Sequence, residues 1–237
     1  MSLDHEKNAT PNLQVLTVPG LNNSGPGHWQ SIWEERRADC HRVELGLWDT
    51  PDRGAWVHQL DLAIRASDGP IVLAAHSLGC LTVAWWAREK WPESGGKVRG
   101  ALLVAPPDVD HRLDDPCVNS FAPTPTSPLP FPALLVGSHN DPYMRFSVAE
   151  RIARQWGCGF ADAGRVGHIN ASSGLGDWSF GQFLLERLIE RATYDLALVT
   201  LNSTNGKRPQ ETRTRETATP PVLVSPQSRG QQSKSLH

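Results

Sequence analysis

Ser77 is the first residue whose surroundings suggest chemistry. It lies in the segment Ala75-His76-Ser77-Leu78-Gly79, between an apolar run at 71–74 and a helical pattern. A strand, a tight turn and a helix in this order present a serine hydroxyl at the carboxyl edge of a sheet, where it can act as a nucleophile. The turn is strained and crowded, so it needs small residues two positions before and two positions after the serine. Ala75 and Gly79 meet that need.

A nucleophilic serine needs two partners, a histidine that takes its proton and a carboxylate that orients the histidine. Asp141 is the acid candidate, because it lies in a turn shortly after the buried run at 133–136. An aspartate before a proline is also common as a helix cap or turn residue. Asp108 and Asp110 compete for the role, because they follow the preceding apolar run at 101–104. The position after the strand and the turn context favour Asp141.

His168 is the base candidate, in a glycine-containing loop after the short run at 159–161. Serine, acid and histidine then follow one another in the order that open α/β sheets use for this chemistry. His76 adjoins Ser77 but is expected to point elsewhere along the turn, and His139 is too near Asp141 in sequence to be oriented by it. His5 and His237 lie in the polar ends of the chain. Three others, His41, His58 and His111, lie outside the active edge or on helix surfaces.

Two backbone amides are expected to stabilise the negative charge that develops on the attacked carbonyl oxygen. Leu78 supplies one of them as the residue after the nucleophile. The second comes from the loop after the first strand, where Gly20 lets the chain turn tightly. Leu21 is the preferred donor in that loop, although the sequence does not separate it from Asn22.

Strand-like apolar runs alternate with helical patterns along most of the chain. The strand-like runs are 13–18, 42–45, 71–74, 101–104, 133–136 and 159–161. The helical patterns are 28–37, 56–66, 81–90, 146–156 and 180–191. The alternation predicts an α/β fold with a doubly wound, mostly parallel sheet flanked by helices, and it places all the candidate residues at the carboxyl edge. The proline-rich loop 105–132 suggests a stiff cover rather than a large lid.

The composition divides the 237 residues into two parts. All nine tryptophans lie between Trp29 and Trp178, whereas the sequence beyond Tyr194 is rich in Thr, Pro, Gln, Arg and Ser. We therefore expect one folded domain at 13–191 and a disordered tail at 192–237. A short apolar patch at 196–201 offers a weaker alternative, in which it extends the last helix or adds an edge strand.

Several classes of function are disfavoured by charge and composition. With 23 basic and 25 acidic residues the net charge is −2, and no basic stripe is present, so nucleic-acid binding is not expected. No stretch approaches the roughly 20 apolar residues that span a bilayer, and the polar N-terminal segment does not resemble a signal peptide. The four cysteines lack CxxC spacing, which favours a reduced, cytoplasmic protein with no metal and no cofactor.

The motifs together resemble the small serine hydrolases of the retinoblastoma-binding-protein-nine and YdeN type, a compact branch of the α/β-hydrolase superfamily. The matching segments, in chain order, are Pro19-Gly20 with Ser24 and His28-Trp29; Trp48, Pro51 and Trp56; His76-Ser77-Leu78-Gly79-Cys80; Ala105-Pro106-Pro107-Asp108; Ser138 with Asn140-Asp141-Pro142-Tyr143; and Gly167-His168-Ile169-Asn170 with Ser173-Gly174-Leu175-Gly176 and Trp178. The resemblance covers the predicted domain and not the tail. It implies a core without a large lid and a Ser77, Asp141 and His168 triad.

The expected function is a serine hydrolase that cleaves carboxylic esters or related acyl compounds through an acyl-enzyme. Its partner would be a small acyl substrate. Two alternatives remain open at this point: a protein-binding module that keeps the fold without catalysis, and a thioesterase or amidase that uses the same site. The tryptophans Trp29, Trp48 and Trp56 are candidates for the pocket wall, although such residues more often pack in the core.

Overall fold

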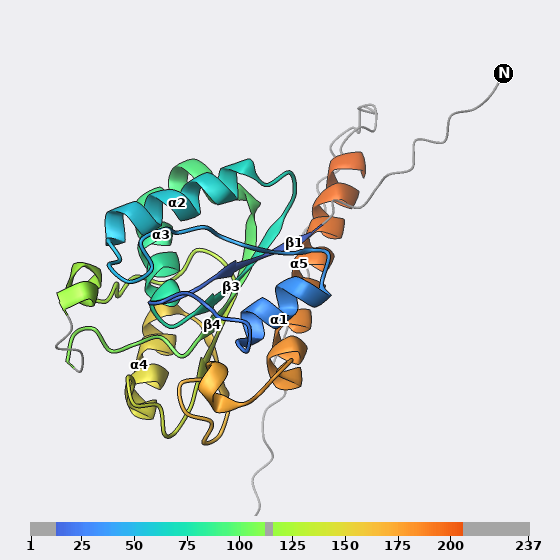
Figure 1. Cartoon of the computed structure of the whole chain (residues 1–237). Coiled ribbons are helices and arrows are strands. Elements are labelled where there is room, and N and C mark those ends of the chain that lie inside the picture. Colours follow the sequence, from blue (N-terminus) through green and yellow to red (C-terminus); the bar gives the residue numbers. More distant parts are fainter. Residues whose placement is uncertain (1–12, 112–115, 206–237) are drawn as a thin grey trace, which may run out of the picture.

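A single six-stranded sheet forms the centre of the computed structural model, which describes residues 13–111 and 116–205 (Figure 1). Its strands lie in the order β2-β1-β3-β4-β5-β6 and every neighbouring pair is parallel. The strands are β1 (Gln14–Val18), β2 (Cys40–Arg42), β3 (Ile71–His76), β4 (Val98–Val104), β5 (Ala133–Gly137) and β6 (Gly159–Asp162). The chain moves outward from β1 to β2 and then returns past β1 to the other half of the sheet, so the carboxyl ends of β1 and β3 meet near its middle.

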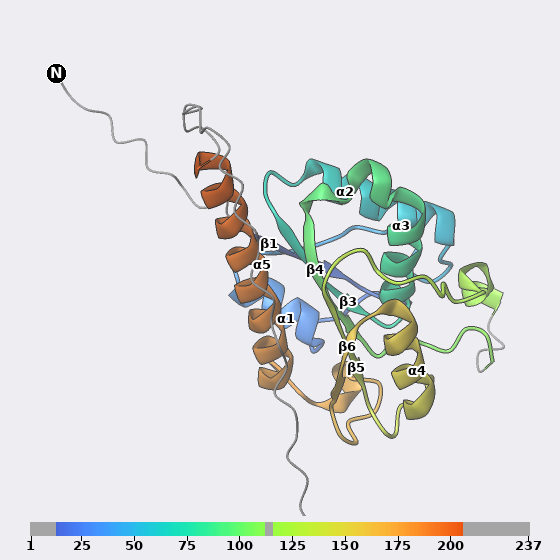
Figure 2. The same cartoon turned by 180° about the vertical axis from the view of Figure 1, so that it is seen from behind.

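Helices cover both faces of the sheet, as Figures 1 and 2 show from opposite sides. One face carries α2 (Arg53–Ala66), α3 (Leu78–Ser94) and α4 (Phe146–Trp156), and the other carries α1 (Trp29–Arg36) and α5 (Ser179–Asn205). Each layer has its own apolar core, one built around Trp56 and Trp86 and the other around Trp29 and Trp33. The predicted fold class, a doubly wound α/β sheet, is confirmed.

The central strands are apolar on both sides because helices bury both of their faces. All six residues of β3 are buried, and its apolar residues alternate between the two cores. Leu73 packs with the α2 and α3 layer, whereas Val72 and Ala74 pack with α1 and α5. This rigid double-sided packing fixes the end of β3, the point at which Ser77 begins the next turn.

Several predicted boundaries are wrong by about three residues; α2, for example, begins at Arg53 rather than at 56, and β4 begins at Val98 rather than at 101. The second strand spans Cys40–Arg42 rather than 42–45, because Val43 leaves the ladder after a last hydrogen bond to the Thr17 carbonyl and its side chain turns into the core. The helix after the nucleophile begins at Leu78 rather than at 81, directly behind Ser77. The apolar pattern missed this first turn, because Gly79 weakens the helical signal.

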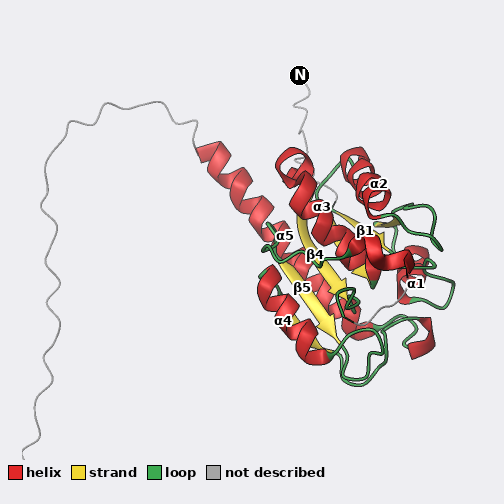
Figure 3. Ribbon diagram, turned by 90° about the vertical axis from the view of Figure 1, so that its left-hand side faces the viewer, coloured by secondary structure: helices red, strands yellow, loops and turns green. Residues whose placement is uncertain are grey.

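Helix α5 continues to Asn205, well past residue 191, where the domain was expected to end (Figure 3). The segment 192–205 is therefore helical and not a tail without structure, in agreement with the alternative that the apolar patch at 196–201 extends the last helix. The rest of the predicted tail, 206–237, lies outside the described residues.

The long segment between β4 and β5 is held to the domain by side-chain hydrogen bonds at several points. Its described part contains one short 3-10 helix, Pro116–Phe121. The indole of Trp85 donates to the Phe121 carbonyl at 2.9 Å, and the indole of Trp156 donates to the Pro125 carbonyl at 2.6 Å. Within the described residues this segment forms a cover without an α-helix. None of the described helices has the length and apolar character that crossing a membrane requires.

Candidate active site

Ser77 sits on a strained turn between β3 and α3. Its φ of 52° lies in the left-handed region, which a residue with a side chain rarely adopts. The turn leaves no room for larger neighbours: a Cβ on Gly79 would lie 2.1 Å from the Val18 carbonyl oxygen. A Cβ on Gly20 would lie 2.8 Å from the Ser77 Cβ, so the loop after β1 presses directly on the serine. The first of these contacts explains why the motif has glycine at position 79.

Ser77, His168 and Asp141 form one chain of hydrogen bonds. The Nε2 atom of His168 lies 2.9 Å from Ser77 Oγ, and its Nδ1 atom lies 2.9 Å and 3.0 Å from the two carboxylate oxygens of Asp141. An ionised carboxylate only accepts, so Nδ1 carries the proton and Nε2 of the neutral ring is free to accept the Ser77 hydroxyl proton. The His168 and Asp141 side chains are 8% and 2% exposed, which leaves little water to compete for these bonds.

The loop that carries His168 is held in an unusual backbone conformation. Gly167 and Ile169, on either side of the histidine, have φ values of 67° and 51°. A β-branched residue at positive φ is a strained exception, so other contacts must hold it there. His76 Nε2 donates to the His168 carbonyl and the Trp29 indole donates to the Ile169 carbonyl, both at 2.9 Å. These two donors fix the position of the imidazole relative to Ser77.

The turn after β5 is tied to the same loop. The Asn140 side-chain oxygen accepts the Gly167 amide at 2.9 Å, and the Ser138 hydroxyl accepts the Val166 amide at 3.1 Å. The Tyr143 amide donates to Asp141 Oδ1 at 2.9 Å. The carboxylate and the imidazole are therefore oriented by backbone contacts as well as by each other.

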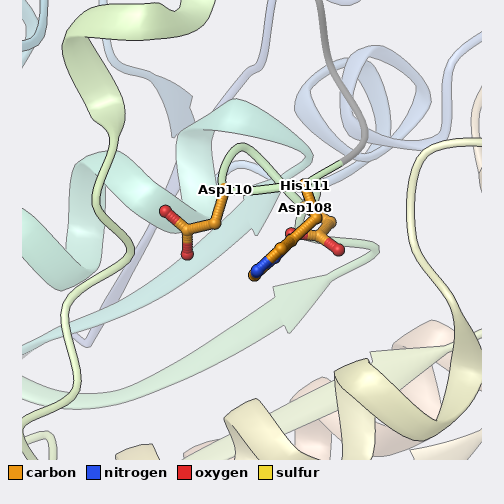
Figure 4. Close-up of side chains that lie close together, drawn as sticks. All are labelled: Asp108, Asp110 and His111. Carbon is orange, nitrogen blue, oxygen red and sulfur yellow. The ribbon is translucent and has the colours of Figure 1, made fainter.

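The competing acids, Asp108 and Asp110, lie on the loop after β4 and have other partners (Figure 4). Asp108 Oδ1 lies 3.2 Å from His111 Nδ1, and Asp110 accepts the Thr124 amide at 3.1 Å. The structure brings neither carboxylate to the His168 ring, whose acidic partner is Asp141.

The same loop residues are the metal-ligand candidates among the described residues. The ligand atoms of Asp108, Asp110 and His111 all lie within 4.8 Å of one another. However, Arg145 and Arg151 line the hollow next to Asp108 and His111, and their positive charges would oppose a bound cation. Asp108 is buried, but Asp110 and His111 are exposed, and exposed acidic groups are common without a metal, so the cluster carries no metal assignment.

The structure distinguishes between the Leu21 and Asn22 amides as oxyanion donors, which the sequence could not do. The Asn22 amide donates to the Trp48 carbonyl at 2.7 Å, so it is not available to a substrate. Leu21, the residue before it, has no amide hydrogen bond to another described residue. Leu78 is the first residue of α3, and its amide has no acceptor within the helix. The two predicted oxyanion donors, Leu21 and Leu78, both line the cleft that contains Ser77.

A cleft of about 500 Å³ opens above the serine. Its walls come from the loop after β1, the segment after β4, the turn after β5 and the histidine loop, and they include Leu21, Asn22, His28, Val118, Tyr143 and Asn170. Trp29 and Trp56 are buried in the two cores and Trp48 packs against one of them, so none of the three tryptophans lines this cleft. A larger hollow of about 940 Å³ lies between α5 and the start of β5, but its lining contains no serine, cysteine or histidine.

Two further histidines adjoin the site, and the sequence assigned neither of them a function. His76 is fully enclosed, and burial, with the charges of His28 and His168, holds its pKa well below the usual value. Burial, Arg42 and His168 lower the pKa of His28 to about 4. Both rings are therefore neutral near neutral pH. The rings of His28 and His76 lie 4.6 Å apart, and those of His76 and His168 lie 4.9 Å apart. In the sequence the available signals were the motif His28-Trp29 for His28 and the position directly before Ser77 for His76.

A family model for serine hydrolases matches residues 15–187. The chain belongs to this family. A YdeN-like hydrolase from Pectobacterium atrosepticum is 33% identical and has a TM-score of 0.65, over 76% of this chain and 90% of that one. The ydeN gene product of B. subtilis is 16% identical with a TM-score of 0.59, over 75% of this chain and 98% of that one. The protein is thus a serine hydrolase of the YdeN-like type, within the α/β-hydrolase superfamily.

More distant structures share the fold alone. A thermophilic esterase from Thermogutta terrifontis is 16% identical with a TM-score of 0.55, over 76% of this chain and 90% of that chain. No curated protein matches the sequence. A shared fold does not identify a substrate, so the substrate of this serine hydrolase has to be inferred from its own residues.

Proposed function

We propose that this hydrolase cleaves carboxylic esters through an acyl-enzyme on Ser77, with His168 as general base and acid and Asp141 as the orienting carboxylate. The observation that carries the proposal is the continuous hydrogen-bonded chain from the serine hydroxyl through the imidazole to the carboxylate. In this chain Nε2 of the imidazole faces the hydroxyl, which is the arrangement in which the imidazole can remove a proton from Ser77.

In the first half of the reaction, Ser77 Oγ attacks the acyl carbonyl as its proton moves to His168 Nε2. Negative charge develops on the carbonyl oxygen, which the Leu21 and Leu78 amides stabilise. Collapse of this intermediate breaks the bond to the leaving alcohol, which takes the proton from Nε2. Asp141 keeps the ring in the required tautomer and stabilises its positive form.

In the second half, water takes the place of the alcohol. His168 Nε2 removes a proton from the water, whose oxygen attacks the acyl carbon and releases Ser77 Oγ with the proton returned to it. The products are a carboxylic acid and the regenerated enzyme. Ser77, His168, Leu21 and Leu78 line the one cleft, and Asp141 acts on it through His168; neither half requires a metal or cofactor.

The test compares wild-type protein with Ser77→Ala and Ser172→Ala. Ser172 also lines the cleft but has no histidine at its hydroxyl. We expect wild type to hydrolyse p-nitrophenyl acetate, Ser77→Ala to lose about 10⁶-fold in kcat, and Ser172→Ala to stay within about threefold. Normal turnover by Ser77→Ala would contradict the proposal. Complete absence of hydrolysis by wild type, across esters, thioesters and amides, would favour a protein-binding role instead.

A further inference from the structure

His28 carries a hydrogen-bond donor whose direction is set by the helix that it begins. It is the N-cap of α1, and its Nδ1 atom accepts the Gln30 amide at 3.2 Å. An atom that accepts an N–H cannot carry a proton itself. The neutral ring therefore has its single proton on Nε2, which is a donor only.

That donor has no acceptor. Nε2 of His28 is buried and lacks a hydrogen-bond partner among the described residues, although the residue as a whole lines the cleft with Ser77 and His168. Buried donors in native proteins almost always have partners, and an exception points to a missing water or ligand. The capping role does not explain it. A serine or aspartate would cap α1 at least as well without burying a second polar atom.

The rest of the cleft restricts what can bind there. Its lining contains no lysine and no arginine, so a carboxylate or phosphate on the substrate would find no cationic partner. A neutral N–H in such surroundings matches a neutral oxygen acceptor: an ether, a hydroxyl or a carbonyl. The side chains of Asn22 and Asn170 give the walls the same neutral polar character.

We propose that His28 Nε2–H donates a hydrogen bond to a neutral oxygen of the substrate, so that the enzyme prefers esters with an acceptor oxygen close to the scissile bond over purely alkyl esters. This inference rests on the proposed function, because Ser77 defines which bond is scissile. The oxygen can belong to the acyl part or to the alcohol part of the ester, and the experiment separates the two sources.

The experiment uses two pairs of esters in which one methylene is replaced by an ether oxygen. The acyl pair is p-nitrophenyl butyrate and p-nitrophenyl methoxyacetate, and the alcohol pair is n-butyl butyrate and 2-methoxyethyl butyrate. The ratio of kcat/KM within each pair is divided by the ratio for hydroxide-catalysed hydrolysis, which removes the difference in intrinsic reactivity. We expect wild type to prefer the ether by about three- to tenfold in one pair, the range of a single neutral hydrogen bond.

His28→Asn retains an acceptor for capping α1 but lacks the ring donor, and His58→Asn is the control on an exposed position of α2. The ether preference should vanish in His28→Asn and persist in His58→Asn. The proposal is overturned if wild type shows no preference in either pair, or if His28→Asn retains it. Should His28→Asn not fold, the wild-type ratios decide. Failure of all four esters to react contradicts the proposed function instead, whereas turnover without preference contradicts only the role of His28.

Discussion

Asp141–His168 and Asp108–His111 are two of the aspartate–histidine pairs at the carboxyl edge of the sheet, and of these two only Asp141–His168 is hydrogen-bonded to a serine hydroxyl. Asp141 and His168 are 2.9 Å apart with side chains 2% and 8% exposed. Asp108 and His111 are 3.2 Å apart, but the His111 side chain is 70% exposed. Burial on both sides strengthens the first pair, while water screens the second.

The larger difference lies in what holds each imidazole. The ring of His76 holds the His168 carbonyl, the indole of Trp29 holds the neighbouring Ile169 carbonyl, and Nε2 of His168 meets Ser77 Oγ. Among the described residues, the hydrogen-bond partner of the His111 ring is the carboxylate of Asp108. A carboxylate beside a histidine is therefore not enough. In the proposed mechanism the Asp141–His168 pair acts because Ser77 meets the other ring nitrogen and two hydrogen bonds hold the backbone beside it.

The strongest way to break this comparison is to remove each histidine in turn. His168→Ala should lower kcat for p-nitrophenyl acetate by about 10⁶-fold, because Ser77 loses the group that accepts its proton. His111→Ala should leave kcat within about twofold. Steady-state kinetics on the two purified variants makes the measurement, and equal losses in both would show that the buried pair has no special role.

Neutralising the two acids is the next test. Asp141→Asn should lower kcat by about 10⁴-fold, because an amide no longer enforces the tautomer of His168 that accepts a proton from Ser77. The isosteric change Asp108→Asn should cost less than about threefold. Both variants keep the volume of the side chain, so circular dichroism and thermal unfolding can verify that each is folded. A larger loss in Asp108→Asn would return the acid role to the loop after β4.

Crowding at the serine gives a smaller effect. Gly20→Ala places a Cβ 2.8 Å from the Ser77 Cβ and 3.1 Å from the Leu78 amide nitrogen. We expect the displaced loop to lower kcat by about 10²-fold through a misplaced oxyanion site. Gly25→Ala is the matched control, because no atom lies within 4 Å of its added Cβ. Unchanged kcat in Gly20→Ala would mean that the loop after β1 does not contribute to the reaction.

The smallest effect concerns the neutral histidine beside the site. The pKa of His28 is about 4 in the folded protein, against 6.5 for an unperturbed histidine, so the unfolded chain binds the extra proton between these values. Above pH 6.5 His28 is neutral in both states and does not lower the free energy of unfolding. As the pH falls toward 4, protonation of His28 in the unfolded chain lowers that free energy. His28→Asn should therefore lose less unfolding free energy than wild type between pH 6.5 and 5, by about 1–2 kcal/mol. Urea unfolding at several pH values measures it, and parallel curves would be the contrary result.

Local sequence patterns predicted the bounds of an element well where a clear stop signal, such as a glycine, follows it. Helix α4 spans Phe146–Trp156 as expected, because Gly157 terminates it with a φ of 68°. The second strand was misplaced, since only three residues pair and the apolar residues after them face the core instead. The end of α5 was missed because the polar composition after Tyr194 resembles a disordered segment although the chain there is helical to Asn205.

The site was predictable to the extent that chain order determines it. Ser77, Asp141 and His168 each follow a strand, and parallel strands bring such residues to one edge. The choice between Leu21 and Asn22 was not predictable, because it depends on a contact with the distant Trp48 carbonyl. The orphan donor of His28 was equally out of reach, since it is defined by what the folded cleft leaves unpaired.

Covalent labelling tests most directly whether the buried pair activates the serine. Wild-type protein treated with a fluorophosphonate and digested should carry the label on the peptide that contains Ser77, and His168→Ala should label at least 10³-fold more slowly. Label on another residue, or labelling of Ser77 at an unchanged rate in His168→Ala, would contradict the account.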